Sequence, residues 1–356
     1  MALTERENFL RNAALHYPEY MPVYTLISDA SWDQCREEME AVLARHPRIW
    51  PGFQPGRRDW EHYDFGPGRT KDLPFRDAWG CVWETRENGI EGVVTESPLE
   101  SWEAWESWSA PDPLKTGDRG PVDWEGIAAK LHARREQGAL CEGELPHGFY
   151  FMRLYYLRGF ANLMTDLATG EPRIEALIDT LCEHNRVLIE QYLRIGVDVI
   201  SVGDDLGTQS ASMIGPDLFR RYCRPAYERL FAPCRAQGCP VLFHSDGYIM
   251  DLVDDLLASG VTILNPQDLC NGIENLRREL KGRACIRLDI DRQSVLPYGS
   301  RQEIHDLVEE AVRTLGAPEG GLELIVGIYP PTPPENVDAL ACAFEKFQRF
   351  WFGESS

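Results

Sequence analysis

Asp198-Val-Ile-Ser-Val-Gly-Asp-Asp-Leu-Gly-Thr-Gln209 is an apolar run that ends abruptly in acidic and polar residues, and Pro240-Val-Leu-Phe-His-Ser-Asp-Gly247 repeats the pattern. A short apolar run bounded by Gly and Asp is typical of a strand buried on both faces of a parallel sheet. In parallel α/β folds, ligands bind where the loops leave the carboxyl ends of the strands. The two stretches therefore predict one site, formed by Asp204, Asp205, Gln209, His244 and Asp246.

From residue 121 to residue 352, predicted strands and helices alternate. The predicted strands are 149–157, 197–203, 239–245, 261–265, 284–290 and 322–329, with a first strand at 21–28. The predicted helices are 123–137, 159–168, 173–194, 216–237, 248–258, 272–281, 301–315 and 334–351. This alternation indicates a parallel sheet, and about eight strands without a linker favour a single (β/α)8 TIM barrel over residues 1–356. An open doubly wound sheet is the alternative, but no Gly-x-Gly-x-x-Gly follows the first strand.

Residues 1–120 read as helical and hairpin additions to this barrel. Thr4 with Glu7 forms a capping-box signature, and a further helix is predicted at 31–46. A long irregular connection follows at 46–76, and 77–84 and 90–96 form a hairpin around an Asn-Gly turn. A third helix at 97–108 carries Trp residues three apart, a spacing typical of core packing and, less often, of a flat apolar ligand site.

The composition restricts the partners and the compartment. The formal charge of −21 disfavours nucleic acid and anionic membranes, and it slows the approach of highly anionic substrates. The ten Cys include no Cys-x-x-Cys pair, and the amino terminus has no apolar signal region. No run of 18 apolar residues is present. We therefore expect a cytoplasmic protein with reduced thiols and no contact with membranes.

The polar residues at the strand ends suggest individual roles. Neighbouring strand residues point to opposite faces, so we expect Asp205 in the pocket and Asp204 to cap a loop or helix. His244 and Asp246 are two apart and share a face, the spacing of a His-carboxylate metal pair or of a general base with a charge partner. A hydrogen-bonded structural histidine is the alternative. A closed zinc site would need more nitrogen or sulfur ligands.

Further strand-end residues are predicted to bind the substrate. Arg153 and Tyr155 would fix a carboxylate or a hydroxyl group from strand 149–157. The other predicted binding residues are Gln209, Asn265, Gln267, Asp77 and Glu96.

The chain resembles the uroporphyrinogen decarboxylase superfamily, and more closely its cobalamin-dependent methyltransferase-like branch. The matching stretches are Thr4–Leu10, Asp77-Ala-Trp-Gly-Cys-Val-Trp83, Glu96–Trp102, Tyr156–Phe160, Gly203–Gln209, His244-Ser-Asp-Gly247, Leu264–Gln267 and Pro333–Val337. The resemblance implies a (β/α)8 barrel with its site at the carboxyl ends of the strands.

The departures from the family pattern concern the chemistry. The Arg-Gln-Ala-Gly-Arg signature of porphyrin decarboxylases is missing near the first strand, and few Arg stand at the strand ends to bind a substrate with eight carboxylates. The thiol-activating methyltransferases of the family hold zinc with a His-x-Cys pair and a later Cys. Here His244-Ser-Asp246 and Val326 stand at those positions.

The leading hypothesis is a methyltransferase that moves a methyl group between a corrinoid on a partner protein and a small substrate. His244 and Asp246 would activate the substrate, with or without zinc, and Asp205 would orient it. The alternatives are a decarboxylase of a small carboxylated compound, with Arg153 and Tyr155 near the leaving carboxylate, and a barrel that binds a small molecule without catalysis.

Overall fold

The computed structural model describes residues 2–353 of the chain. Its centre is a sheet of seven parallel strands in the order β1-β12-β11-β10-β9-β8-β7. The strands are β1 (Val23–Ile27), β7 (Glu142–Glu144), β8 (Val199–Gly203), β9 (Val241–Ser245), β10 (Ile263–Pro266), β11 (Cys285–Asp289) and β12 (Leu322–Ile328). The predicted α/β barrel class is confirmed, as a curled, seven-stranded half-barrel. No described strand of this sheet lies between β1 and β7 in the chain, because residues 46–120 form loops and small antiparallel sheets instead.

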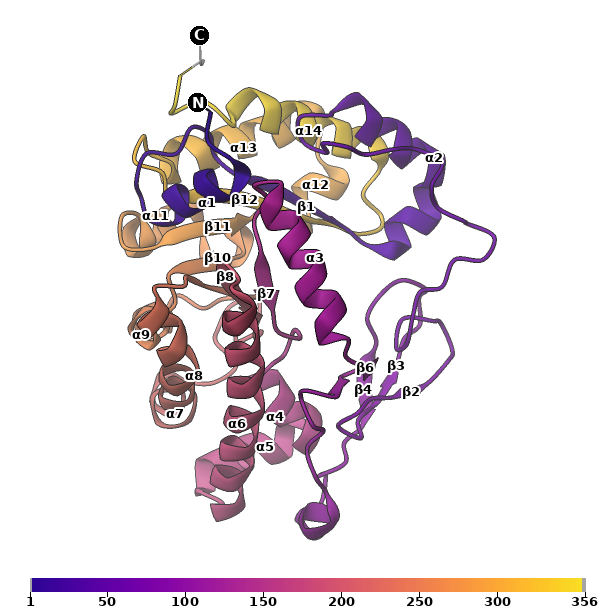
Figure 1. Ribbon diagram of the computed structural model, residues 1–356, viewed down its shortest axis with the longest axis vertical. Helices are drawn as coiled ribbons and strands as arrows, with labels where there is room; N and C mark the ends of the chain where they lie inside the picture. The colour runs from indigo at the N-terminus through magenta and orange to yellow at the C-terminus, as the bar shows by residue number, and fades with distance from the viewer. Residues whose placement is uncertain (1, 354–356) are drawn as a thin grey trace.

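Helices cover the outside of the sheet (Figure 1). In chain order they are α1 (Glu5–Ala13), α2 (Asp29–Arg45), α3 (Trp124–Glu136), α4 (Phe151–Arg158), α5 (Phe160–Thr169), α6 (Pro172–Ile195), α7 (Pro216–Leu218), α8 (Arg224–Gln237), α9 (Val253–Ser259), α10 (Asp268–Asn271), α11 (Ile273–Leu280), α12 (Val295–Tyr298), α13 (Arg301–Leu315) and α14 (Pro334–Phe347). A π-helical turn (Phe219–Cys223) joins α7 to α8. Within residues 2–353, no helix combines the length and the apolar character needed to cross a membrane.

Helix α1 closes the amino end of the half-barrel. Its capping box at Thr4 and Glu7 forms as predicted. Phe9 of α1 is fully buried in a small apolar cluster with Val199, Leu242 and Ile263 of the central strands. The amino ends of these strands are therefore sealed from solvent, which leaves the carboxyl ends as the accessible side.

The short strands between residues 75 and 121 lie at the end of the molecule that also carries α4 and α5, whereas α1 and α2 lie at the end with α13 and α14 (Figure 1). The predicted hairpin is confirmed as β3 (Val82–Glu84) and β4 (Val93–Glu96), which pair with a short β2 (Phe75–Arg76). A second pair, β5 (Thr116–Gly117) and β6 (Gly120–Pro121), follows. The Trp-rich segment forms a 3₁₀ helix, Trp102–Ser107, in place of the predicted α-helix. Its Trp rings pack against the main core, which favours the core interpretation.

The predicted strand 149–157 is wrong, because this segment forms helix α4 and the barrel strand is β7 at Glu142–Glu144. Aromatic and aliphatic residues at 149–157 suit a buried strand, but Phe151, Leu154 and Leu157 are buried at the helical spacing of three. The carboxylate of Asp204 accepts hydrogen bonds from the backbone N–H groups of Phe151 and Met152, at 2.6 and 2.8 Å. It thereby caps the first turn of the helix.

Candidate active site

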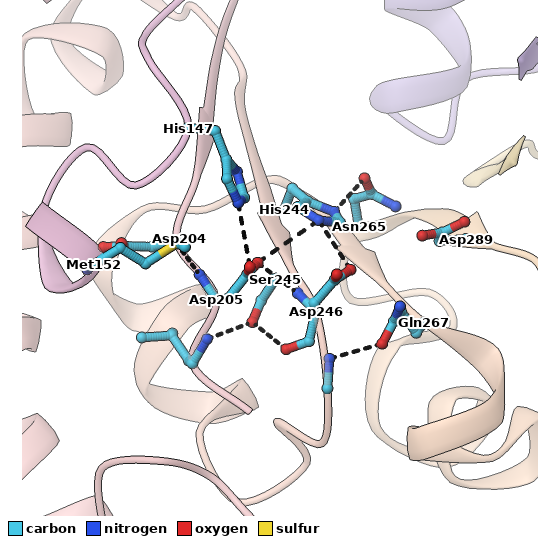
Figure 2. Close-up of polar contacts among 12 residues, drawn as sticks. His147, Met152, Asp204, Asp205, His244, Ser245, Asp246, Asn265, Gln267 and Asp289 are labelled. Carbon is cyan, nitrogen blue, oxygen red and sulfur yellow. Dashed lines mark hydrogen bonds and ion pairs between the residues drawn. The ribbon is translucent and has the colours of Figure 1, made fainter. Parts of the chain in front are cut away.

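Three side chains converge where β8 and β9 end. Gly203 pairs with His244 across the sheet, and His244 pairs with Asn265, so these strands end at the same level. His244 Nε2 lies 3.2 Å from Asp246 Oδ1 and 3.9 Å from Asp205 Oδ1. One ligand atom from each of Asp205, His244 and Asp246 lies within 4.8 Å of the others. We call these three residues the central cluster (Figure 2). The predicted convergence of their side chains is confirmed.

Asn265 fixes the orientation of the His244 ring. Its side-chain amide donates a hydrogen bond to the backbone oxygen of Arg287 at 2.5 Å. The amide oxygen of Asn265 must therefore face His244 Nδ1, which lies 2.9 Å away and donates its proton. Nε2 of the neutral ring then keeps its lone pair and points at the two carboxylates.

The charges of the central cluster shift one another's pKa values. Burial opposes the charged imidazole, but the hydrogen bond to Asp246 and the charges of Asp246, Asp205 and Asp289 raise the pKa of His244 to about 9. Burial also opposes the Asp205 carboxylate, but the hydrogen bond and charge of His147 lower its pKa to about 2. In the protein alone, the cluster is therefore an ion pair between an imidazolium and two carboxylates.

Arg292 and Asp289 extend the cluster on the side of β11. Arg292 Nη2 donates to both carboxylate oxygens of Asp246 at 2.7 Å, and Arg292 Nη1 lies 3.6 Å from Asp289 Oδ2. Asp289 is buried, and burial raises its pKa to about 6. Arg292 brings a second cation to the site, which the sequence pattern does not reveal because this residue follows the strand end by three positions.

His147 is a further residue that the sequence pattern does not reveal. Its Nε2 lies 3.2 Å from Asp205 Oδ2, and its ring centroid lies 5.6 Å from that of His244. Figure 2 shows dashed lines from both His147 and His244 to the Asp205 carboxylate. His147 follows β7 closely, but Glu142-Gly-Glu144 is not an apolar run. The Pro146-His147-Gly148 turn is the only sequence signal for this position.

Asp204 and Asp205 point in different directions, as predicted. Asp204 is fully buried and caps α4, and it also accepts a hydrogen bond from the hydroxyl of Tyr227 at 2.8 Å. Asp205 faces the cluster and accepts the backbone N–H of Asp246 at 3.0 Å. This last hydrogen bond joins the loop after β8 to the loop after β9. The carboxylates of Asp204 and Asp205 are therefore both held by backbone N–H groups.

Gln267 and Gln209 lie at the rim. The amide oxygen of Gln267 accepts the backbone N–H of Gly247 at 2.8 Å, so this residue supports the β9 loop. Gln209 is exposed and lies 3.4 Å from Gln293, and the thiol of Cys270 donates to it at 3.3 Å. Gln209 therefore remains accessible to a ligand, whereas Gln267 is buried.

The other predicted binding residues do not join the cluster. Arg153 stands on α4, where its guanidinium is buried between Asp77 at 3.1 Å and Asp118 at 2.5 Å. Tyr155, also on α4, packs its ring against those of Tyr156 and Phe160.

Asp77 and Glu96 have structural partners. Asp77 accepts the backbone N–H groups of Trp79 and Cys81, which fixes the turn before the hairpin. Glu96 is exposed on β4 and pairs with Arg76 at 2.9 Å. Neither residue contacts the central cluster.

A cavity of about 520 Å³ lies beside the cluster. His147 forms one wall, and the amino-terminal additions, α3 and α6 form the others. This volume is in the range that holds a small organic ligand. Because His147 also contacts Asp205, the cavity adjoins the central cluster through one side chain.

Sequence comparison relates this chain to a known protein family. The pattern of the family described as Uroporphyrinogen decarboxylase (URO-D) matches residues 77–347. The uroporphyrinogen decarboxylases of two Thermus thermophilus strains are each 30% identical over 175 residues. That match covers 46% of this chain and 47% of theirs, so it spans about half the length of these relatives.

A methyltransferase from Methanosarcina mazei has a similar structure, with a TM-score of 0.67. The similarity covers 97% of this chain and 99% of that protein, at 18% sequence identity, and it shows the fold alone. A curled parallel sheet with a polar cluster at the carboxyl ends of its strands is the architecture of a barrel enzyme. The chain belongs to the uroporphyrinogen decarboxylase family.

Proposed function

We propose that this protein is a methyltransferase that moves a methyl group between a corrinoid on a partner protein and a small substrate. The observation that carries the proposal is the central cluster, where Asn265 orients His244 so that its Nε2 faces two carboxylates. Methyl transfer requires a group that sets the charge of the methyl-bearing or methyl-accepting atom. A histidine between two carboxylates performs this as an acid when it is protonated, or as part of a cation site when a bound cation displaces its proton.

The donor set of the cluster fits a divalent cation. One imidazole nitrogen and two carboxylate oxygens supply three donors, the number of protein ligands in a catalytic zinc site that keeps one position open, although with fewer nitrogen ligands than most such sites. Asn265 would act as the outer partner that orients the histidine ligand. When bound, such a cation supplies Lewis acidity that lowers the pKa of a coordinated substrate group. The thiolates of the thiol-activating enzymes are absent at these positions, which favours an oxygen or nitrogen acceptor over a thiol.

Cation affinity is expected to rise with pH. Because the pKa of His244 is raised to about 9, binding at lower pH displaces its proton. The apparent association constant for Zn²⁺ should therefore increase about tenfold per pH unit between about pH 6 and about pH 8, as calorimetry would measure. Asp205→Asn and His244→Ala should each abolish high-affinity binding of Zn²⁺. Equal affinity at both pH values, or in His244→Ala, would exclude the cluster as the cation site.

The rim of the half-barrel supports docking of a corrinoid protein. Leu26 near the end of β1, Leu269 on α10 and Tyr298 on α12 are 58%, 50% and 73% exposed. Leu26 lies near the carboxyl end of β1, and Leu269 and Tyr298 follow the carboxyl ends of β10 and β11. Exposed large apolar residues can contribute to a partner surface. The corrinoid would supply or accept the methyl group. Asp205 and His244 would hold the substrate, and the docked partner would exclude water.

The test measures methyl transfer in both directions, from methylcobalamin to a panel of small amines, phenols and thiols, and from the methylated forms of these compounds to cob(I)alamin. The change in the cobalamin spectrum reports the transfer. The proposal predicts cobalamin-dependent turnover that requires His244.

A decarboxylase is the second candidate, because Arg292 places a cation beside protonated His244 and could bind a carboxylate. Carbon dioxide release that is independent of cobalamin would support the decarboxylase and contradict methyl transfer.

A further inference from the structure

The cavity beside the central cluster has an aromatic lining. Phe75 and Trp83 come from the β2–β3 hairpin, Trp124 from α3 and Tyr192 from α6. The rings of Trp124 and Tyr192 meet edge to face, with centroids 5.2 Å apart. Leu145, Leu188, Val122 and Ile127 add aliphatic surface. The lining therefore provides apolar and π surface on several sides of one ligand-sized space.

Every arginine that lines this cavity already has a carboxylate partner. Arg69 lies 3.1 Å from Glu91, which also pairs with Arg119. Arg153 is held between Asp77 and Asp118. An incoming anion would have to break one of these ion pairs, and the net charge of −21 would oppose its approach.

Glu144 is the exception among the charged lining residues. It is the last residue of β7 and lines the cavity beside His147. Within residues 2–353 its carboxylate has no hydrogen bond or ion pair. The lining holds four carboxylates and three guanidinium groups, so with neutral histidines it carries one excess negative charge, at Glu144.

We propose that this cavity binds a small organic cation, a methylated ammonium group, with its charge at the carboxylate of Glu144 and its methyl groups against the aromatic lining. Aromatic rings and a carboxylate are the usual recognition set for quaternary ammonium groups, because the charge is spread over apolar methyls. Under the proposed function this cation is the methyl donor: one N–CH3 bond breaks, the methyl group passes to the reduced corrinoid of the partner protein, and the nitrogen keeps the electron pair and leaves as a tertiary amine. Its role as substrate therefore rests on that function, but its binding does not.

His147 connects the cavity to the reaction site. It lines the cavity and its Nε2 lies 3.2 Å from Asp205 Oδ2, so one side chain contacts both the cavity and the central cluster. A cationic ligand in this cavity would need no cationic side chain to hold it.

The experiment is a calorimetric titration of the full chain with tetramethylammonium, with tert-butanol as the neutral probe of similar shape and pivalate as the anionic one. Tetramethylammonium should bind at least about tenfold more tightly than either, a difference of about 1.4 kcal/mol. Glu144→Gln should weaken this binding about tenfold or more and leave the affinity for tert-butanol unchanged. Trp124→Leu should weaken it as well, because an aromatic contact is lost.

Glu142→Gln is the matched control, since it removes the same charge two residues earlier on β7, outside the cavity lining. It should retain full affinity, and thermal unfolding would confirm that all variants are folded. Pivalate binding as tight as tetramethylammonium binding, or equal losses in Glu142→Gln and Glu144→Gln, would overturn the proposal. Tetramethylammonium binding without methyl transfer would instead contradict only the proposed function. Methyl transfer from other compounds without tetramethylammonium binding would contradict only the cation site.

Discussion

Replacing His244 by alanine is expected to lower methyl transfer by about 10²–10⁴-fold, the usual contribution of a positioned acid–base or ligand residue. His244 is the only residue that contacts both carboxylates of the central cluster within residues 2–353, so its loss leaves Asp205 and Asp246 without their shared partner. The rate should fall in kcat, because the imidazole acts on the reacting group. Steady-state kinetics with methylcobalamin would measure it, and circular dichroism would confirm the fold.

Two further variants separate chemistry from structure. Asn265→Ala removes the acceptor for His244 Nδ1, so it should reduce kcat less than His244→Ala does, by about 10–100-fold as for outer-shell partners of a ligand. Asn265→Asp keeps an oxygen acceptor and should recover part of the loss. His62→Ala is the matched control, because His62 is an 80% exposed histidine that also pairs with an aspartate. Full activity in His244→Ala would remove this residue from the mechanism.

The strand ends of β8 and β9 could be predicted from the sequence because both strands are continuous apolar runs that stop at charged residues. Their parallel pairing then brings Asp205, His244 and Asp246 together without any further information. Strand alternation predicts that Asp204 and Asp205 point to opposite sides, and the structure shows that Asp205 is the one in the cluster. This part of the site depends on local pattern, which a single sequence contains.

Strand β7 could not be predicted in the same way. Glu142-Gly-Glu144 lies at the edge of the sheet and faces an open cavity, so its side chains need not be apolar. The more hydrophobic segment 149–157 resembles a strand more closely, and its interpretation as one places Arg153 and Tyr155 at a strand end, whereas both residues stand on α4. The same error hides His147 and Glu144. What decides α4 is a tertiary contact, the Asp204 cap, which no local pattern shows.

The ion pair between Arg287 and Glu323 is expected to give the largest stability effect. Arg287 Nε donates to Glu323 Oε2 at 2.6 Å, and the two side chains are 7% and 0% exposed. They are neighbours on β11 and β12, and Arg287 lies 4.4 Å from the ring of Tyr24. The backbone oxygen of Arg287 also anchors Asn265, so this pair supports the residue that orients His244.

Removing one partner of this pair leaves a buried charge without compensation. Arg287→Ala and Glu323→Ala should each lower the free energy of unfolding by about 3–5 kcal/mol, measured by urea denaturation. The double variant Arg287→Met with Glu323→Leu should cost clearly less than the sum of the two, because neither charge remains. Arg76→Ala, which breaks the exposed pair with Glu96, should cost under about 1 kcal/mol and serves as the control. Additive effects, or single losses as small as that of Arg76→Ala, would show that water reaches this pair and that the amino end of the half-barrel is not sealed.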